Sequence, residues 1–284
     1  MPARQLTLAV IVLVLFAGVL HATWNAIASA ITDKTVAFAL IGAAQAVLGL
    51  IVLPIAGLPR SGAVPFAAAS AVIHVVYTAA LLQSYRLGGF GRTYPLARGV
   101  APLLVGAGAW VIAGEHLSAL QIAGTCTIAA ALTAIVFAGG RLTGADLPAT
   151  AAALLTGVTI ASYTVVDGLG VRHAHNPAGY LALLFLIEEP AILAIALYRL
   201  RRRLDRRLLR DVPAGLGAGA ISVLAYGIVV WAQTHGPLAL VSALRETSVI
   251  SAALIATLLF KEPFARRRLL PSVAVAVGIV LIAV

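Results

Sequence analysis

The sequence has little charge, which excludes most soluble proteins. Lysine, arginine, aspartate and glutamate make up 11% of its 284 residues, while 61% are hydrophobic and the mean hydropathy is +1.03. A soluble domain of this size carries roughly 25% charged residues. Membrane β-barrels are excluded as well, because their strands alternate polar and apolar residues in ~10-residue segments. The apolar runs here reach the ~20 residues that a membrane helix needs, so the composition predicts an all-α membrane protein.

Motifs for several kinds of chemistry are also missing. The one cysteine, Cys126, cannot form an internal disulfide bond. No Gly-x-x-x-x-Gly-Lys-Ser/Thr segment is present, so ATP is not expected to drive the protein directly. His21 and His74 have no ligand partners nearby at the spacing of a metal site. We therefore expect no metal and no cofactor.

The net charge of +10 is concentrated in one segment. Residues 198–211 hold seven arginines and two aspartates and contribute half of the total. A basic run beside an apolar segment is typical of a topology signal that meets anionic lipid headgroups. Membrane lipids are therefore expected partners, and nucleic acid is not.

Charged and Pro/Gly-rich breaks divide the chain into ten apolar stretches, each predicted to be a transmembrane helix. They are residues 6–31, 36–57, 64–85, 93–113, 119–138, 147–169, 178–198, 212–233, 239–260 and 269–284. The first is longer than the ~7–15 residues of a signal-peptide core, so we expect it to be retained. Because the breaks are short, we expect consecutive helices to pack as antiparallel neighbours in a compact bundle.

The distribution of positive residues predicts the orientation, since lysine and arginine are retained in the cytoplasm. The loops that follow the odd-numbered stretches carry 15 of the 20 lysine and arginine residues. The opposite side, with both termini, has only Arg4, Arg60 and Arg172. This bias predicts a multi-pass protein of the cytoplasmic (inner) membrane with both termini outside.

An internal repeat relates the two halves of the chain. Arg98 and Glu115 are spaced like Arg245 and Glu262, and Trp24 aligns with Tyr163 between the first and sixth stretches. The repeats are residues 1–140 and 141–284, with five helices each. An odd number of spans inserts the halves in opposite directions, so the sequence predicts two inverted five-helix repeats, an arrangement typical of secondary transporters.

Four short motifs carry a resemblance to a known family. They are His-Ala-Thr-Trp-Asn-Ala at 21–26, Tyr-Pro-Leu-Ala-Arg-Gly at 94–99, Gly-Glu-x-Leu at 114–117 and Lys-Glu-Pro-Phe at 261–264. With the ten stretches, they resemble the drug/metabolite transporter (DMT) superfamily, EamA type. The resemblance implies ten helices around a central cavity, with the first four helices of each half lining it and the fifth packed outside.

One feature departs from a branch of that superfamily. The small multidrug resistance branch has a membrane-embedded glutamate in its first span, whereas the polar residues of the first stretch here are His21 and Asn25. Export of cationic drugs by that mechanism is therefore not expected.

Ionisable groups inside the apolar stretches are the main candidates for function, because a charge in the membrane is costly unless it is paired or hydrated. Five such groups stand out: Arg98, Arg245, Glu246, Glu188 and Glu189. Arg98 and Arg245 are predicted to bind an anionic group of the substrate, one on each side of the midplane. Glu188 and Glu189 are predicted to couple transport to protons, one pairing and the other titrating. The alternative is structural: either arginine could form an ion pair with Glu188 or Glu189 that only locks the bundle.

Polar and aromatic residues in other stretches are predicted to complete a substrate-binding cavity. His21, Trp24 and Asn25 share one helical face through their i, i+3 and i+4 spacing. The remaining candidates are His74, Tyr77, Tyr94, Tyr163 and Tyr226. Each could instead be an ordinary residue of helix packing.

These features favour a secondary active transporter that is not an enzyme. It would move a small polar metabolite, anionic or zwitterionic, by alternating access, driven by protons or by exchange. The alternative is an intramembrane enzyme or a lipid-carrier protein acting on an anionic substrate, although the acids are scattered and not clustered as such enzymes need. The sequence leaves open whether the chain works as a monomer or as a homodimer.

Overall fold

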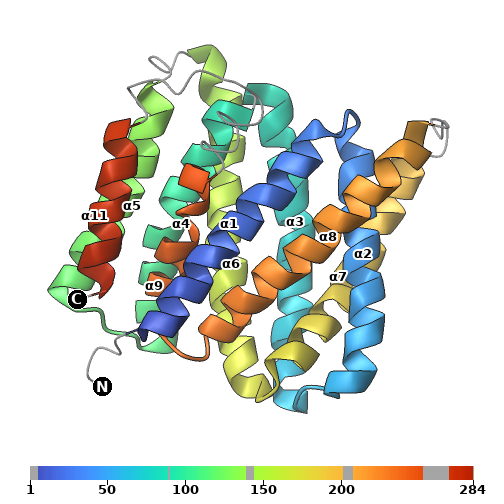
Figure 1. Ribbon diagram of the computed structural model, residues 1–284, viewed down its shortest axis with the longest axis horizontal. Coiled ribbons are helices and arrows are strands. Elements are labelled where there is room, and N and C mark those ends of the chain that lie inside the picture. The colour runs from blue at the N-terminus through green and yellow to red at the C-terminus, as the bar shows by residue number, and fades with distance from the viewer. Residues whose placement is uncertain (1–5, 89, 139–143, 201–206, 252–268, 284) are drawn as a thin grey trace.

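The computed structural model describes residues 6–88, 90–138, 144–200, 207–251 and 269–283, and these ranges contain helices and no strands (Figure 1). The α-helices are α1 (Leu8–Ala30), α2 (Lys34–Ala56), α3 (Val64–Gly88), α4 (Phe90–Ala113), α5 (Ala119–Ala138), α6 (Leu147–Ala174), α7 (Pro177–Leu200), α8 (Arg207–Ala232), α9 (Leu238–Arg245) and α11 (Leu269–Ala283). Two short 3₁₀ helices, η1 (Ser61–Ala63) and η2 (Gly144–Asp146), precede α3 and α6.

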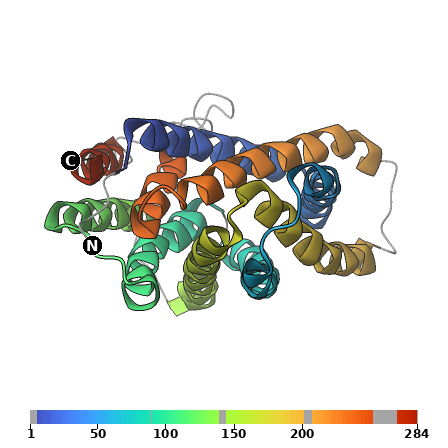
Figure 2. The same cartoon turned by 90° about the horizontal axis from the view of Figure 1, so that it is seen from below.

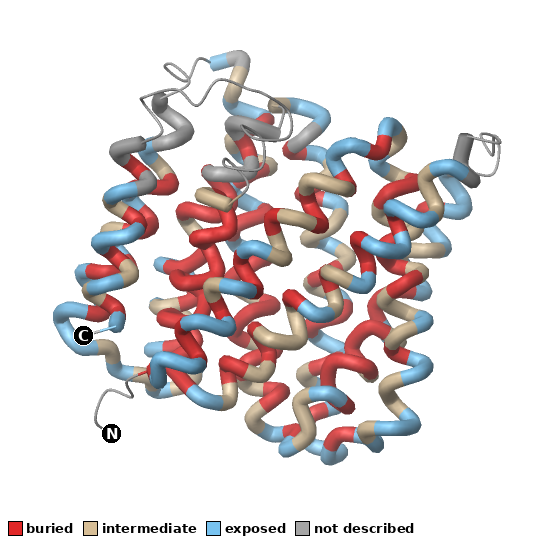
Figure 3. The backbone as a smooth tube through the Cα atoms, in the orientation of Figure 1, coloured by how far each residue is buried: buried red, intermediate tan, exposed pale blue. Residues whose placement is uncertain are grey.

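Seven segments in the described ranges are long and apolar enough to cross a membrane, and the prediction of a multi-span helical membrane protein is confirmed. They comprise α1, α2, η1 with α3, and most or all of α4, α6, α7 and α8. Large apolar side chains on the outer surface fit this environment: Ile55 is 81% exposed, Leu8 76% and Val111 72%. Buried residues gather on the inward sides of the helices (Figure 3).

Local signals set several helix ends. The Asp33 side chain caps α2 by accepting hydrogen bonds from the backbone N–H groups of Thr35 at 2.8 Å and Val36 at 3.4 Å, which explains the sharp break after α1. Gly57 follows α2 with φ of 81°, a conformation that costs glycine little. Helix α6 continues past its expected end at residue 169 to Ala174, and α8 begins at Arg207, before its expected start at residue 212.

The helices pack mainly across the two halves of the chain, and several consecutive helices touch as expected, although most of these contacts are small. The most extensively packed pairs are α3 with α6, α2 with α7, α4 with α6, α1 with α8, and α5 with α11. Among the helices that the structure describes, only α4 and α5 are both consecutive and extensively packed. A short loop holds two helices together at one end, but their axes can diverge from there, and helices of the other half fill the space.

Packing between the two halves places one pair of helices on each of two opposite faces, with the other helices between them. The α1 and α8 pair lies on one face and the α3 and α6 pair on the opposite face (Figure 2). The start of α1 and the end of α11 lie at the same edge (Figure 1). The packing therefore draws helices from both halves to the centre.

The predicted continuous helix at 239–260 is interrupted within its described part. Helix α9 ends at Arg245, and Glu246 and Thr247 form a turn before helical structure resumes at Ser248. Hydrogen bonds here are of the tighter three-residue type, from Thr247 N–H to Leu244 O at 3.2 Å and from Val249 N–H to Glu246 O at 3.1 Å. The break places Glu246 in the interior, where it is fully buried.

Two glycines of α8 have contrasting surroundings. At Gly219 an added Cβ would lie 2.7 Å from the Ile41 carbonyl oxygen of α2, whereas nothing lies within 4 Å of a Cβ at Gly217. Gly219 therefore allows the close approach of α8 to α2, as small residues do between membrane helices.

We expect Gly219→Ala to lower the thermal midpoint of the purified protein in detergent, because overpacking costs about 1–3 kcal/mol. Gly217→Ala is the matched control on the same helix, and it should be neutral or slightly stabilising because alanine is the better helix former. Equal midpoints for the two variants would show that the α8–α2 contact does not need a glycine.

Candidate functional site

A polar cavity of about 100 Å³ lies among α1, α2, α3, α6, α7, α8 and α9. Nine of the predicted site residues line it: His21, Trp24, His74, Tyr77, Tyr163, Glu188, Glu189, Tyr226 and Arg245. Its other lining residues include Phe38, Gln45, Thr78 and Ser222, which the sequence did not single out. The structure thus brings most of the candidate residues to one place.

Three predicted residues lie elsewhere or have no described side chain. Asn25 faces a separate hollow, and its Nδ2 donates to the His21 carbonyl oxygen at 2.8 Å. Arg98 lies beside the cavity, in an ion pair described below. Tyr94 belongs to α4, but its side chain is outside the described part of the chain.

Glu246 joins the two buried arginines. Its Oε1 lies 3.0 Å from Nη1 of Arg98 and 3.6 Å from Nε of Arg245, and its Oε2 accepts from Arg98 at 3.3 Å. The structural alternative, an internal ion pair of these arginines, is thus present with Glu246 as the acid in place of Glu188 or Glu189. Both guanidiniums lie close to one carboxylate at the end of α9, and their placement on either side of the midplane stays a prediction.

Helix α1 contributes to the same cluster through His21. The His21 Nε2 contacts Nη2 of Arg98, while its Nδ1 accepts a hydrogen bond from the Trp24 indole at 3.2 Å. The other side of the cluster is formed by α6, where the Tyr163 hydroxyl accepts from Arg245 at 3.2 Å. The arginines are thus held by groups from α1, α6 and α9.

Aromatic rings form the middle of the cavity. His74 stacks on Tyr163 with centroids 4.1 Å apart, and Tyr77 and Tyr226 contact His74 edge-on at 6.2 and 6.0 Å. The Arg245 guanidinium lies 5.9 Å from the Tyr163 ring centroid. Such faces attract cations as well as apolar groups.

Glu188 and Glu189 of α7 form the acidic part of the lining. Glu188 lies 3.8 Å from His74 Nδ1, and Glu189 Oε2 has no hydrogen-bond partner although the residue is only 1% exposed. Both carboxylates reach the cavity, each against a different neighbour: Glu188 against α3, and Glu189 against Gly42 of α2. Among the described residues, no lysine or arginine forms an ion pair with either of them.

Asp167 is a buried acid that sequence reasoning missed. It is fully buried in α6 and accepts hydrogen bonds from the hydroxyls of Tyr180, at 2.8 Å, and Tyr226. Because Tyr226 also lines the cavity, Asp167 orients part of the cavity wall. The rule that marks ionisable groups inside membrane helices would have found it, but Asp167 lay almost at the expected end of its span, at residue 169.

Phe38 separates the cavity from two hollows at the edge where α1 ends and α2 begins. It lines the cavity as well as a hollow of about 550 Å³ with Lys34 and Arg86 and another of about 280 Å³ with Arg86 and Arg199. A positively charged mouth raises the local concentration of anions. Phe38 is therefore the side chain that the cavity shares with both hollows.

At the other end of the bundle, a polar network surrounds Arg172 of α6. Arg172 forms an ion pair with Glu115 at 2.7 Å and donates to the carbonyl oxygens of Gln233 at 2.9 Å and Gly236 at 2.8 Å. Glu115 also accepts from the backbone N–H of Leu238, which begins α9. The end of α6 is thereby tied to the α4–α5 and α8–α9 connections.

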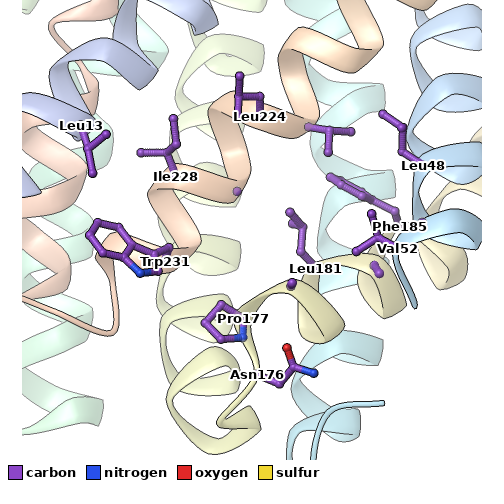
Figure 4. Close-up of a pocket in the computed structure, with 15 residues that line it drawn as sticks. Leu13, Leu48, Val52, Asn176, Pro177, Leu181, Phe185, Leu224, Ile228 and Trp231 are labelled. Carbon is purple, nitrogen blue, oxygen red and sulfur yellow. The ribbon is translucent and has the colours of Figure 1, made fainter. Parts of the chain in front are cut away.

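A larger hollow of about 520 Å³ has a different character. Figure 4 shows that apolar side chains dominate its lining. The labelled side chains are Leu13, Leu48, Val52, Asn176, Pro177, Leu181, Phe185, Leu224, Ile228 and Trp231. It has no charged group in its lining, so we place the candidate site in the smaller polar cavity.

The fold and this cavity define an all-helical, multi-span membrane protein with a small charged interior. Residues 147–284, slightly less than half of the chain, match the model of the EamA-like transporter family. The resemblance to EamA-type members of the drug/metabolite transporter superfamily is thereby confirmed.

Solved structures with the same fold also exist. One crystal structure of a protein has 19% sequence identity and a TM-score of 0.74, with 98% of each chain covered. At this identity the likeness shows the fold alone. A comparison with curated protein sequences found no match.

We expect Arg98→Ala and Glu246→Gln each to lower the thermal midpoint strongly, because breaking a buried ion pair costs about 3–5 kcal/mol. The double variant should lower the thermal midpoint by less than the sum of the two single losses, since neither partner is then left buried without the other. Thermal unfolding in detergent of all four proteins measures this coupling, with exposed Arg60→Ala as the control. Additive losses would contradict the pairing.

Proposed function

We propose that this protein is a secondary active transporter that moves a small polar metabolite, anionic or zwitterionic, across the cytoplasmic membrane by alternating access. The observation that carries this is one buried polar cavity lined by residues of both halves, including Arg245, Glu188 and Glu189. Burying so many ionisable groups is costly in a membrane, and by default they mark a pathway for a solute. The match of residues 147–284 to a transporter family supports the same function.

The proposed architecture is ten transmembrane helices as two inverted repeats, 1–140 and 141–284. The helix pairs support it, because exchanging each helix with its counterpart in the other half turns α1–α8 into α6–α3 and leaves α2–α7 and α4–α9 unchanged. Residues 252–268, where part of the second repeat is expected, lie outside the described residues.

In the proposed cycle, the two halves rock about this cavity. The edge near Phe38 opens to the cytoplasm, and the edge near Arg172 opens to the outside. Arg245, held by Tyr163 and Glu246, binds the anionic group of the substrate. Glu188, beside His74, carries a proton when transport is driven by a pH gradient, and solute exchange needs no proton.

The test of transport is counterflow in proteoliposomes, after a thermal-shift screen of amino acids, organic phosphates, phosphonates and sugars has found a ligand. Wild-type protein should accumulate labelled ligand against preloaded unlabelled ligand and leave it chemically unchanged. Arg245→Ala should lower the counterflow rate about 10-fold or more. Arg245→Lys should not restore the rate, since ammonium lacks the bidentate geometry of guanidinium. Chemical conversion of the ligand would indicate an enzyme instead.

The orientation can be tested with single cysteines after Cys126 is replaced by serine. An impermeant thiol reagent on intact cells should label a cysteine at Gly62, which lies on the surface in η1, and should not label one at Arg206. Arg206 is outside the described residues and belongs to the arginine-rich segment predicted to be cytoplasmic. The reverse labelling pattern would place the termini inside.

A further inference from the structure

The polar cavity holds opposite charges that do not meet each other. Arg245 makes one hydrogen bond, to Tyr163, and its Nε makes none, although Glu246 lies 3.6 Å away. Glu189 has an unpartnered Oε2 and forms no ion pair with a described lysine or arginine. Arg245 and Glu189 are 3% and 1% exposed, so water satisfies neither group fully.

The structure keeps these charges apart. The ring of Tyr163 lies against Arg245, and His74 stacks on that ring and faces Glu188. Glu246, the acid nearest to Arg245, already receives two hydrogen bonds from Arg98. On the other side, Glu189 lies so close to Gly42 that a Cβ there would overlap its Oε2. The wall of α2 is therefore shaped to leave room for this carboxylate.

We infer that Glu189 is a binding site for the ammonium group of a zwitterionic substrate whose anionic group binds Arg245. This inference rests on the proposed transport function and narrows its substrate class to small amino-zwitterions. A ligand with both charges would supply hydrogen-bond partners to Arg245 Nε and Glu189 Oε2 at once, whereas a simple anion would leave Glu189 Oε2 without one. The cavity volume of about 100 Å³ fits a molecule of small amino-acid size, well below the roughly 300–1,000 Å³ of drug-sized sites.

The aromatic lining fits the same substrate. Trp24, Tyr77 and Tyr226 line the cavity together with Glu189, and aromatic faces favour an ammonium group more than a neutral polar group. Glu188 differs from Glu189 because it faces His74. The two adjacent acids therefore have different roles: Glu189 binds the ammonium group, and Glu188 carries the proton.

The experiment compares ligands that differ only by the amino group. The probes are β-alanine with propionate, taurine with ethanesulfonate, and phosphoethanolamine with ethyl phosphate, measured by thermal shift on the purified full-length protein. For at least one pair, the affinity for the zwitterion should be at least about 10-fold higher than the affinity for the partner without the amine. This difference is expected for a charge-assisted hydrogen bond in a buried site. Propylamine alone should not bind measurably.

Two variants test whether the ammonium group of the ligand binds Glu189. Glu189→Gln should lower the affinity for the zwitterion about 10-fold or more and leave the affinity for the amine-free partner unchanged. Gly42→Ala should have the same selective effect by displacing the carboxylate without removing it. Glu188→Gln is the matched neighbour and should keep the preference for the zwitterion. The midpoint of each ligand-free variant shows that it is folded.

Several outcomes would overturn the inference. They are equal binding of both members of every pair by the wild type, binding of none of the probes, or an unchanged preference in Glu189→Gln. A Glu189→Gln variant that loses only pH-driven uptake would also overturn it and make Glu189 a proton carrier. Selective zwitterion binding without counterflow would support the subsite and contradict transport, so the two proposals fail separately.

Discussion

The interior of this protein depends on one buried carboxylate. Glu246 is fully buried at the break after α9, where it lies within ion-pair distance of both Arg98 and Arg245. Without it, two guanidiniums would face each other in a region of low dielectric, where an unpaired charge costs several kcal/mol. Because Arg98 also contacts His21, the same carboxylate fixes α1, α4 and α9 relative to one another. The position of Arg245 in the cavity wall follows from this cluster.

The sequence predicted the helices better than their packing. Membrane helices need long apolar runs, and α5 at Ala119–Ala138 has the predicted bounds. Apolarity says little about which faces meet, since alanine, valine and leucine fill every helix, and the pairing of α2 with α7 became visible only in the structure. The ten-helix count and the inverted repeat stay predictions.

Site residues were predictable where a charge stood deep in an apolar run. That rule found Arg98, Arg245, Glu188 and Glu189, but it gave no partners, because Arg98 and Glu246 are 148 positions apart. Asp167 escaped it because α6 is longer than its most apolar part, and the helix continues through Arg172 to Ala174. Sequence spacing therefore identifies candidate groups, and the fold decides which of them meet.

The two ends of the helical bundle are held by different kinds of contact, so the proposed conformational cycle is asymmetric. At one edge an aromatic side chain, Phe38, stands between the cavity and the hollows beyond. A rotamer change there breaks no described ion pair and takes place on the ps–ns scale typical of side chains. At the other edge, opening must separate Arg172 from Glu115 and from two backbone carbonyls. In the proposed cycle, opening at this edge therefore breaks more interactions than opening at the Phe38 edge.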